Sequence, residues 1–152
     1  MSLAYKHCRQ GHGFSLIELA TALAIVAVLA AIALPAWHHY LQRGWRAQAR
    51  AALTEAMLQL ERHAAGAMTF AAEPGADVPA GQWPRQIPAT GTVRHTLTAG
   101  ACAEETLDAC VELRAEPRQP DPQCGVLILR STGQWLVLPA GQATAQARPP
   151  EC

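Results

Sequence analysis

The feature that most constrains this chain is an uncharged segment near its start. From Leu19 to Gln42 no side chain carries a formal charge. As a helix with a rise of about 1.5 Å per residue, this segment is about 36 Å long, whereas the hydrocarbon core of a bilayer is about 30 Å thick. The segment can therefore span a membrane. One carboxylate, Glu18, immediately precedes it and lies within the wider apolar run.

The segment could be a signal peptide, a signal anchor or a segment that is cut before Phe14, and Glu18 helps to distinguish these interpretations. The basic residues Lys6 and Arg9 precede the run, as they do in a secretory signal peptide with cleavage near residues 31–33, or in a plain signal anchor. Neither needs a charged residue, and an ionised carboxylate inside a membrane helix costs about 2.5 to 3.5 kcal/mol on insertion scales. If the chain were cut before Phe14, the new α-amino group would lie one helical turn from Glu18 and could neutralise it. In an assembly, the amine of a neighbouring subunit could do the same.

The residues around this position resemble a known processing signal. The string GFSLIEL, from Gly13 to Leu19, is similar to the cleavage site of type IV prepilins and pseudopilins, and Pro35 matches the same family. The resemblance implies that a membrane-embedded prepilin peptidase cuts after Gly13 and methylates the new amine of Phe14. It implies that Glu18 sets the register between subunits and that Pro35 marks a point where the packed helix locally loses its hydrogen bonds. Residues 1–13 would be a leader, and residues 14–40 would be first a membrane anchor and later the core of a filament.

An amphipathic pattern follows the uncharged segment. Apolar residues recur every three or four positions across residues 41–65, which predicts a helix that continues the membrane segment and carries the start of a globular head, residues 41–152. Gly66 is the expected stop. Arg43, Arg46 and Arg50 share one face of this helix by their spacing. Phosphate contact is one reading of this face, and we favour a solvated or intersubunit surface.

The rest of the head predicts an α+β fold. Residues 71–92 are rich in proline and glycine and indicate a long loop. Four strand candidates follow within residues 93–139, and an antiparallel sheet of four strands would bury its apolar face against the helix. The candidates are residues 93–99, 109–115, 125–131 and 134–139, the last two joined by a turn at Thr132 and Gly133.

Cysteines indicate an oxidising compartment. Four of the five lie in the last third of the chain, at Cys102, Cys110, Cys124 and Cys152, which is typical of a disulfide framework. The family resemblance implies a C-terminal disulfide loop, here Cys124 to Cys152, that ties down the tail of residues 140–152. It leaves Cys102 and Cys110 as the other pair. The residues alone allow three pairings.

The histidines and acidic residues carry no motif for catalysis or a cofactor. The sequence contains no Ser/His/Asp order, no HExxH motif, and no cysteine or histidine spacing of the zinc type, so we expect no enzyme, no catalytic residue, no metal site and no cofactor. Without residues 1–13 the chain has 10 basic and 12 acidic residues, so its net charge gives DNA binding no support.

The sequence therefore predicts a minor pilin of a type IV pilus. By resemblance, its partners would be other pilin subunits, the prepilin peptidase and the pilus assembly machinery of the bacterial inner membrane, with the head in the periplasm before assembly and in an extracellular filament afterwards. Such pili act in adhesion and twitching motility. The alternatives are a type II secretion pseudopilin, which shares the N-terminal motif, and a secreted or anchored periplasmic binding domain, which requires neither the cut at Gly13 nor a role for Glu18.

Overall fold

A computed structural model describes residues 15–152 of the chain. Its first element is one long helix, α1, Leu16–Ala67. The chain divides into two compact units, one ending at His39 and the other comprising Tyr40–Cys152, and each is described by itself. The candidate leader, residues 1–13, and Phe14 after it lie outside the described residues.

In the first unit, α1 exposes its apolar side chains. Leu23, Val26 and Leu29 are each about 60% exposed, and Leu16 is 87% exposed. Leucine and alanine favour a helix, but a helix that is apolar on all sides has no aqueous face. Among residues 15–152, α1 is the one helix long and apolar enough to cross a membrane.

In the second unit, α1 has a sharply defined buried face. Ala49, Leu53, Ala56, Met57 and Leu60 are at most 5% exposed, at the spacing of three and four that aligns residues on one helical face. This confirms the amphipathic helix predicted from the sequence. The helix ends at Ala67, two residues beyond the expected Ala65, and the residue in the left-handed region is Met68, with φ of 60°, rather than the predicted stop Gly66.

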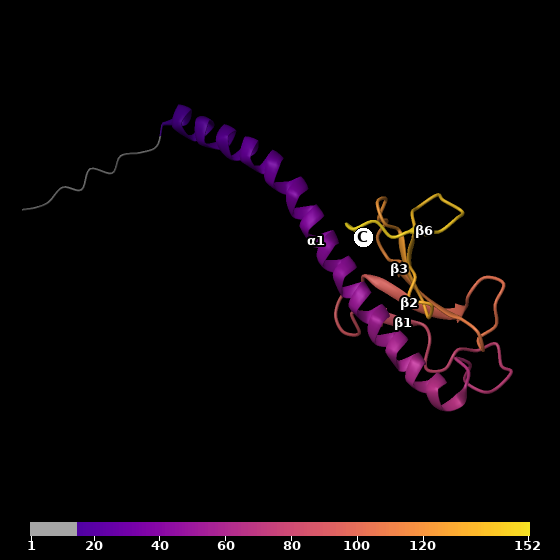
Figure 1. Cartoon of the computed structure of the whole chain (residues 1–152). Coiled ribbons are helices and arrows are strands. Elements are labelled where there is room, and N and C mark those ends of the chain that lie inside the picture. The colour runs from indigo at the N-terminus through magenta and orange to yellow at the C-terminus, as the bar shows by residue number, and fades with distance from the viewer. Residues whose placement is uncertain (1–14) are drawn as a thin grey trace, which may run out of the picture. The chain divides into compact units, whose positions relative to one another are not determined.

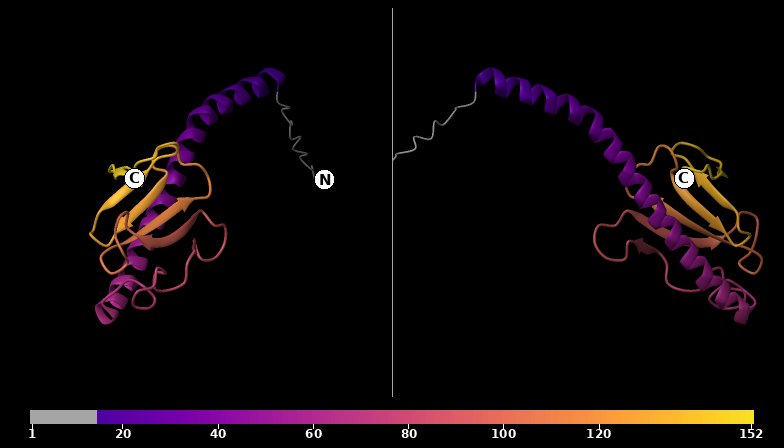
Figure 2. Two further views of the ribbon diagram at one scale, coloured as in Figure 1. Left: turned by 90° about the vertical axis from the view of Figure 1, so that its right-hand side faces the viewer. Right: turned by 60° about the vertical axis from the view of Figure 1, so that its left-hand side comes forward.

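The rest of the head is a six-stranded antiparallel sheet in the order β1-β2-β3-β4-β5-β6. Figures 1 and 2 show the sheet lying along one side of the head portion of α1, drawn in magenta. The strands are β1 Arg85–Ile87, β2 His95–Ala101, β3 Val111–Pro117, β4 Val126–Arg130, β5 Trp135–Leu138 and β6 Gln146–Ala147.

The register of the four central strands places one apolar row across the sheet. Leu97 pairs with Ala115, Ala115 with Leu127, and Leu127 with Val137, and all four side chains are at most 2% exposed. They belong to the same buried cluster as Ala49, Leu53 and Leu60 of α1. The core is therefore a helix packed on a sheet, and the predicted α+β class is correct.

The sheet has two more strands than the four expected. β1 lies inside the segment interpreted as loop, residues 71–92, and β6 lies inside the tail. Both are short edge strands, of three and two residues, without the alternation of apolar and polar side chains that marks a half-buried strand. These two strands form because they pair with β2 and β5, so no local sequence pattern predicts them.

Gly125 holds the entry to β4 close to the end of β5. Its φ is 60°, and a Cβ at this position would lie 2.0 Å from the carbonyl oxygen of Leu138. Only glycine accommodates both the backbone conformation and this contact. Gly125 follows Cys124 directly, so the close approach also fixes where the second disulfide enters the sheet.

Candidate functional site

The predicted assembly residues lie on α1. Glu18 is in its first turn, exposed, and its backbone carbonyl accepts a hydrogen bond from the hydroxyl of Thr21 at 2.9 Å. Its carboxylate has no ion pair within residues 15–152. Pro35 lies inside α1, which continues through it. Of the predicted processing motif, therefore, the structure describes only the residues from Ser15 onward.

Two disulfides join the four C-terminal cysteines. One links Cys102 to Cys110, and the other links Cys124 to Cys152. The first closes the connection between β2 and β3, and the second fastens the end of the chain to the residue before β4. All four side chains are at most 6% exposed.

A buried ion pair connects α1 to this second disulfide. Arg46 donates from Nε and Nη2 to the two carboxylate oxygens of Asp121, each at 2.7 Å, and is itself 3% exposed. Its Nη1 also donates to the side chain of Gln123 and to the carbonyl of Glu151. The expectation of a solvated arginine face is therefore wrong for Arg46. Sequence spacing could place this side chain on a face but could not show that the loop before Cys124 folds back over it.

Asp121 is the acceptor at the centre of this contact. Burial alone would raise the pKa of this carboxyl group, but the hydrogen bonds from Arg46 and from the backbone N–H groups of Cys124 and Gln123, together with the charge of Arg46, lower it overall. Asp121 was not among the residues predicted from the sequence. The available signal was the position of Asp121, two residues before Gln123 and three before Cys124. At this spacing an aspartate carboxylate accepts hydrogen bonds from backbone N–H groups.

Arg50 extends the contact to the chain's last described residue. Its Nη1 donates to the carbonyl oxygen of Cys152. The pKa of this guanidinium is lowered by burial and by the positive charges of Arg148 and Arg46. Thus two of the three arginines on the predicted face, Arg46 and Arg50, hold the tail, and only Arg43 is exposed.

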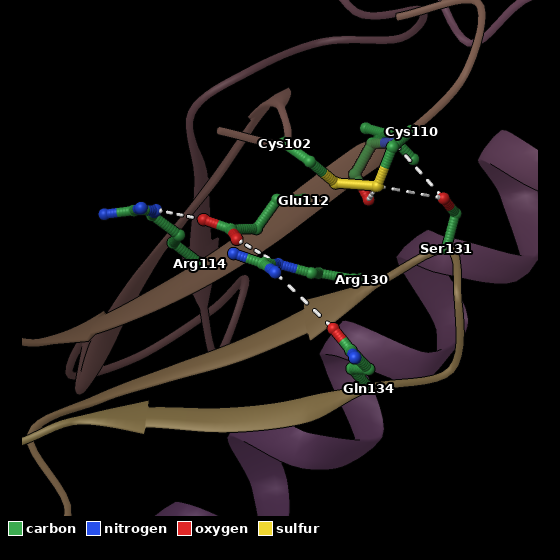
Figure 3. Close-up of a disulfide and its surroundings, with 8 residues drawn as sticks. Cys102, Cys110, Glu112, Arg114, Arg130, Ser131 and Gln134 are labelled. Carbon is green, nitrogen blue, oxygen red and sulfur yellow. Dashed lines mark hydrogen bonds and ion pairs between the residues drawn. A yellow bond between two sulfur atoms is a disulfide. The ribbon is translucent and has the colours of Figure 1, made fainter. Parts of the chain in front are cut away.

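A third buried charge lies on the opposite side of the sheet from α1. Glu112 is 4% exposed and accepts hydrogen bonds from Arg114 and Arg130, both at 2.7 Å. Figure 3 shows its carboxylate between the two guanidinium groups, beside the Cys102–Cys110 disulfide. The pair of arginines neutralises Glu112 and leaves one net positive charge in this cluster.

Three arginines stack on tryptophans. The guanidinium carbon of Arg85 lies 4.2 Å from the ring centre of Trp83, that of Arg94 lies 4.2 Å from Trp45, and that of Arg148 lies 5.6 Å from Trp135. Such stacking holds a cation in place without neutralising it. None of the three arginines makes an ion pair with a carboxylate in the described part of the chain. None of these pairs was predicted from the sequence, and the pairs of Arg94 and Arg148 join segments that are distant along the chain.

A cavity of about 50 Å³ lies beside Arg94. Its lining includes the side chains of Trp45, Arg46 and Asp121, and the buried His95, which is 4% exposed. The Nδ1 atom of His95 has no hydrogen-bond partner among residues 15–152. Burial lowers the pKa of this imidazole, and the charge of Asp121 opposes the shift only in part. Among the described residues no group of three histidines, cysteines or carboxylates could hold a metal ion.

Comparisons with known proteins agree with this architecture. A family model described as the type IV minor pilin ComP, DNA uptake sequence receptor, matches residues 35–128, and a model of the prokaryotic N-terminal methylation motif matches residues 8–34. No curated protein matches the chain, and no solved structure matches it. Pilins are structural subunits and not an enzyme family. Since the first model covers more than half of the 152 residues, the chain belongs to the type IV minor pilin family of ComP.

Proposed function

We propose that the chain is a minor subunit of a type IV pilus that binds duplex DNA for uptake. The observation that carries this proposal is the match of residues 35–128 to a family described as a DNA uptake sequence receptor. It favours DNA capture over the adhesion and twitching roles expected from pilins in general. It also weighs against a type II secretion pseudopilin and against a secreted or anchored binding domain.

The chain's balanced net charge does not decide this proposal, because part of the charge of both signs is paired within the protein. Two acidic residues, Asp121 and Glu112, are buried and neutralised by arginines. A phosphate backbone responds to exposed cations held in place more than to the net charge of the whole chain. The arginines that matter for DNA binding are therefore exposed ones that no carboxylate neutralises.

Arg85, on the edge strand β1, is the best candidate. It donates from Nη1 to the side-chain oxygen of Gln59 at 2.7 Å and from Nε to the carbonyl of Gln82 at 3.1 Å, and it stacks on Trp83. Every one of these partners is neutral. Arg85 thus presents a fixed, uncompensated guanidinium on an open sheet edge, inside the matched region, with the exposed amide of Gln86 beside it. Arginine and glutamine are the side chains that contact phosphates and base edges.

Titration of the full-length chain in detergent micelles with duplex DNA over a series of salt concentrations tests this proposal. Removing one phosphate contact by Arg85→Gln should weaken binding about tenfold and reduce the slope of log affinity against log salt by about 1. Arg118→Gln is the control, because it removes the same charge from an exposed arginine that the structure joins to no tryptophan or carboxylate. Absence of saturable DNA binding by the unmodified chain would contradict the DNA role, and equal losses in both variants would contradict the role of Arg85.

We further propose that the chain is cleaved between Gly13 and Phe14 and methylated on the Phe14 amine by a prepilin peptidase. The match of residues 8–34 to the methylation motif supports this step. The cleaved subunit waits in the inner membrane with its head in the periplasm. The assembly machinery then inserts it among other pilin subunits, where Glu18 meets the amine of a neighbour and α1 loosens near Pro35.

Two measurements test processing and assembly separately. The mass of the N-terminal peptide, from protein purified out of its native membrane, should correspond to a methylated Phe14. An intact Met1 would contradict cleavage. Glu18→Ala should remain in the membrane fraction but be lost from sheared filaments, and its presence there at normal levels would remove the assembly role of Glu18.

A further inference from the structure

The cavity beside Arg94 has a chemistry that neither pilus assembly nor DNA capture uses. Arg94 is held over Trp45, and no carboxylate in residues 15–152 neutralises it. The other arginine in the lining, Arg46, is occupied by Asp121 through two hydrogen bonds. The lining therefore holds two positive charges and one negative charge, and the free one belongs to Arg94.

His95 supplies a second, independent observation at this cavity. The side chain is 4% exposed and lines the cavity, yet its Nδ1 has no partner within the described residues. A buried polar atom without a hydrogen bond costs about 1 to 3 kcal/mol, so native structures usually supply one. With its proton on Nδ1, the imidazole can donate to an anion that also accepts from Arg94.

The cavity's volume limits what can enter. A site of about 50 Å³ holds a few water molecules, at roughly 10 to 15 Å³ each, or one tetrahedral oxyanion. A phosphate group carried on a larger molecule fits if the remainder of that molecule stays outside.

The position of the cavity along α1 indicates what carries the phosphate. Of its helical lining residues, Gln42 is the last residue of the uncharged segment, and Trp45 and Arg46 lie within the next helical turn. Trp45 follows Gln42 by about 5 Å of helical rise, and the headgroup layer beyond the hydrocarbon is about 5 to 8 Å thick. Tryptophan and arginine are the residues that favour this layer. The nearest phosphates to an anchored subunit are therefore those of the bilayer.

We propose that the cavity formed by Trp45, Arg94 and His95 binds the phosphate of a phospholipid headgroup while the subunit is anchored in the membrane. The acyl chains remain in the bilayer beside the uncharged segment. Arg94 and the Nδ1–H of His95 donate to the phosphate oxygens, and the Trp45 ring holds the guanidinium in position.

Calorimetric titration of the full-length chain in neutral detergent tests the proposal. The probes are dihexanoyl phosphatidylglycerol, inorganic phosphate and a short DNA duplex. We expect saturable binding of the lipid, weakened about tenfold or more in Arg94→Gln because a charge-assisted contact is lost. Arg118→Gln should remain within about twofold, since Arg118 has the same charge but does not line the cavity.

Nuclear magnetic resonance of the unmodified chain labelled with ¹⁵N-histidine keeps the test independent of how the variants fold. The Nδ1 signal of His95 should shift when the lipid is added and stay unchanged on addition of duplex DNA. Three results would overturn the proposal. They are no saturable lipid binding, equal weakening by Arg94→Gln and Arg118→Gln, and a shift of the His95 signal with DNA or inorganic phosphate but not with the lipid.

Discussion

The two parts of α1 have the same secondary structure and opposite surroundings. Up to His39 its leucines and valines are exposed, as Leu23 and Val28 are at 61% and 64%. Beyond Tyr40 the same helix buries Leu53 completely and neutralises its buried Arg46 with Asp121. Helix formation thus comes from local sequence in both parts, whereas the buried core of the described residues includes side chains of the second part. The first part needs lipid or other subunits to cover it.

This contrast teaches where single residues determine stability. In the head part, truncating a buried side chain takes contacts away from the residues packed around it. In the apolar part, a side chain that touches nothing in the chain can be shortened without loss to the fold. Substitutions matched between the two parts can therefore confirm or break the comparison.

The largest effect is expected from Arg46→Met. Removing one partner of a buried ion pair leaves the carboxylate of Asp121 without its cation, which typically costs about 3 to 5 kcal/mol. The tail would also lose the hydrogen bond from Arg46 to Glu151. Urea unfolding of the full-length chain in detergent micelles measures this loss. Arg43→Met, an exposed arginine one turn earlier, should change the free energy of unfolding by at most about 0.5 kcal/mol. Equal effects would mean that Arg46 is solvated after all.

Leu53→Ala compared with Leu23→Ala tests the contrast directly. Leu53 is 0% exposed within the core, so its truncation should cost about 2 to 5 kcal/mol, through lost transfer energy and a residual cavity. Leu23 should give no measurable change in the unfolding of the head by the same urea titration. A large effect of Leu23→Ala on the head would show that the two parts depend on each other.

What the sequence could predict follows the same division. The uncharged segment, the amphipathic helix and the four central strands were predictable, because each has a local period that its burial enforces. The edge strands β1 and β6 were not, since pairing alone creates them. The predicted site residue Glu18 lies in the first turn of α1, and its assembly role stays a prediction. The partners of Arg46 and Arg94 come from segments about 50 to 75 residues away and carry no local signal.

The two disulfides provide a smaller comparison inside the head. The sequence separation of Cys102–Cys110 is 8 residues and that of Cys124–Cys152 is 28. In the chain-entropy model, loops of these lengths contribute about 2.6 and about 3.6 kcal/mol. Replacing both cysteines of each pair by alanine should therefore destabilise the head more for the second pair, by about 1 kcal/mol, in the same unfolding assay. The reverse order would show that contacts of the shorter loop outweigh its length.

The smallest effect is expected from the titration of His95. Burial lowers the pKa of its imidazole below the ordinary value of 6.5, and the charge of Asp121 offsets this only in part, while Arg46 and Arg94 also line the same cavity. The folded chain therefore binds fewer protons at this position than the unfolded chain. Its contribution to stability is complete above pH 6.5 and declines as the pH falls through the lower, folded pKa.

Unfolding curves between pH 7.5 and pH 5 should thus show a loss of stability that His95→Gln reduces and His38→Gln, at an exposed histidine of the apolar part, leaves unchanged. Asp121 does not contribute to this slope, because its lowered pKa places its own titration below 3.8. If His95→Gln left the slope unchanged, the imidazole would be as accessible to protons in the head as in the unfolded chain. Adding the phospholipid probe should flatten the slope in the unmodified chain, since an anion beside His95 favours its protonated form and raises its pKa in the folded state.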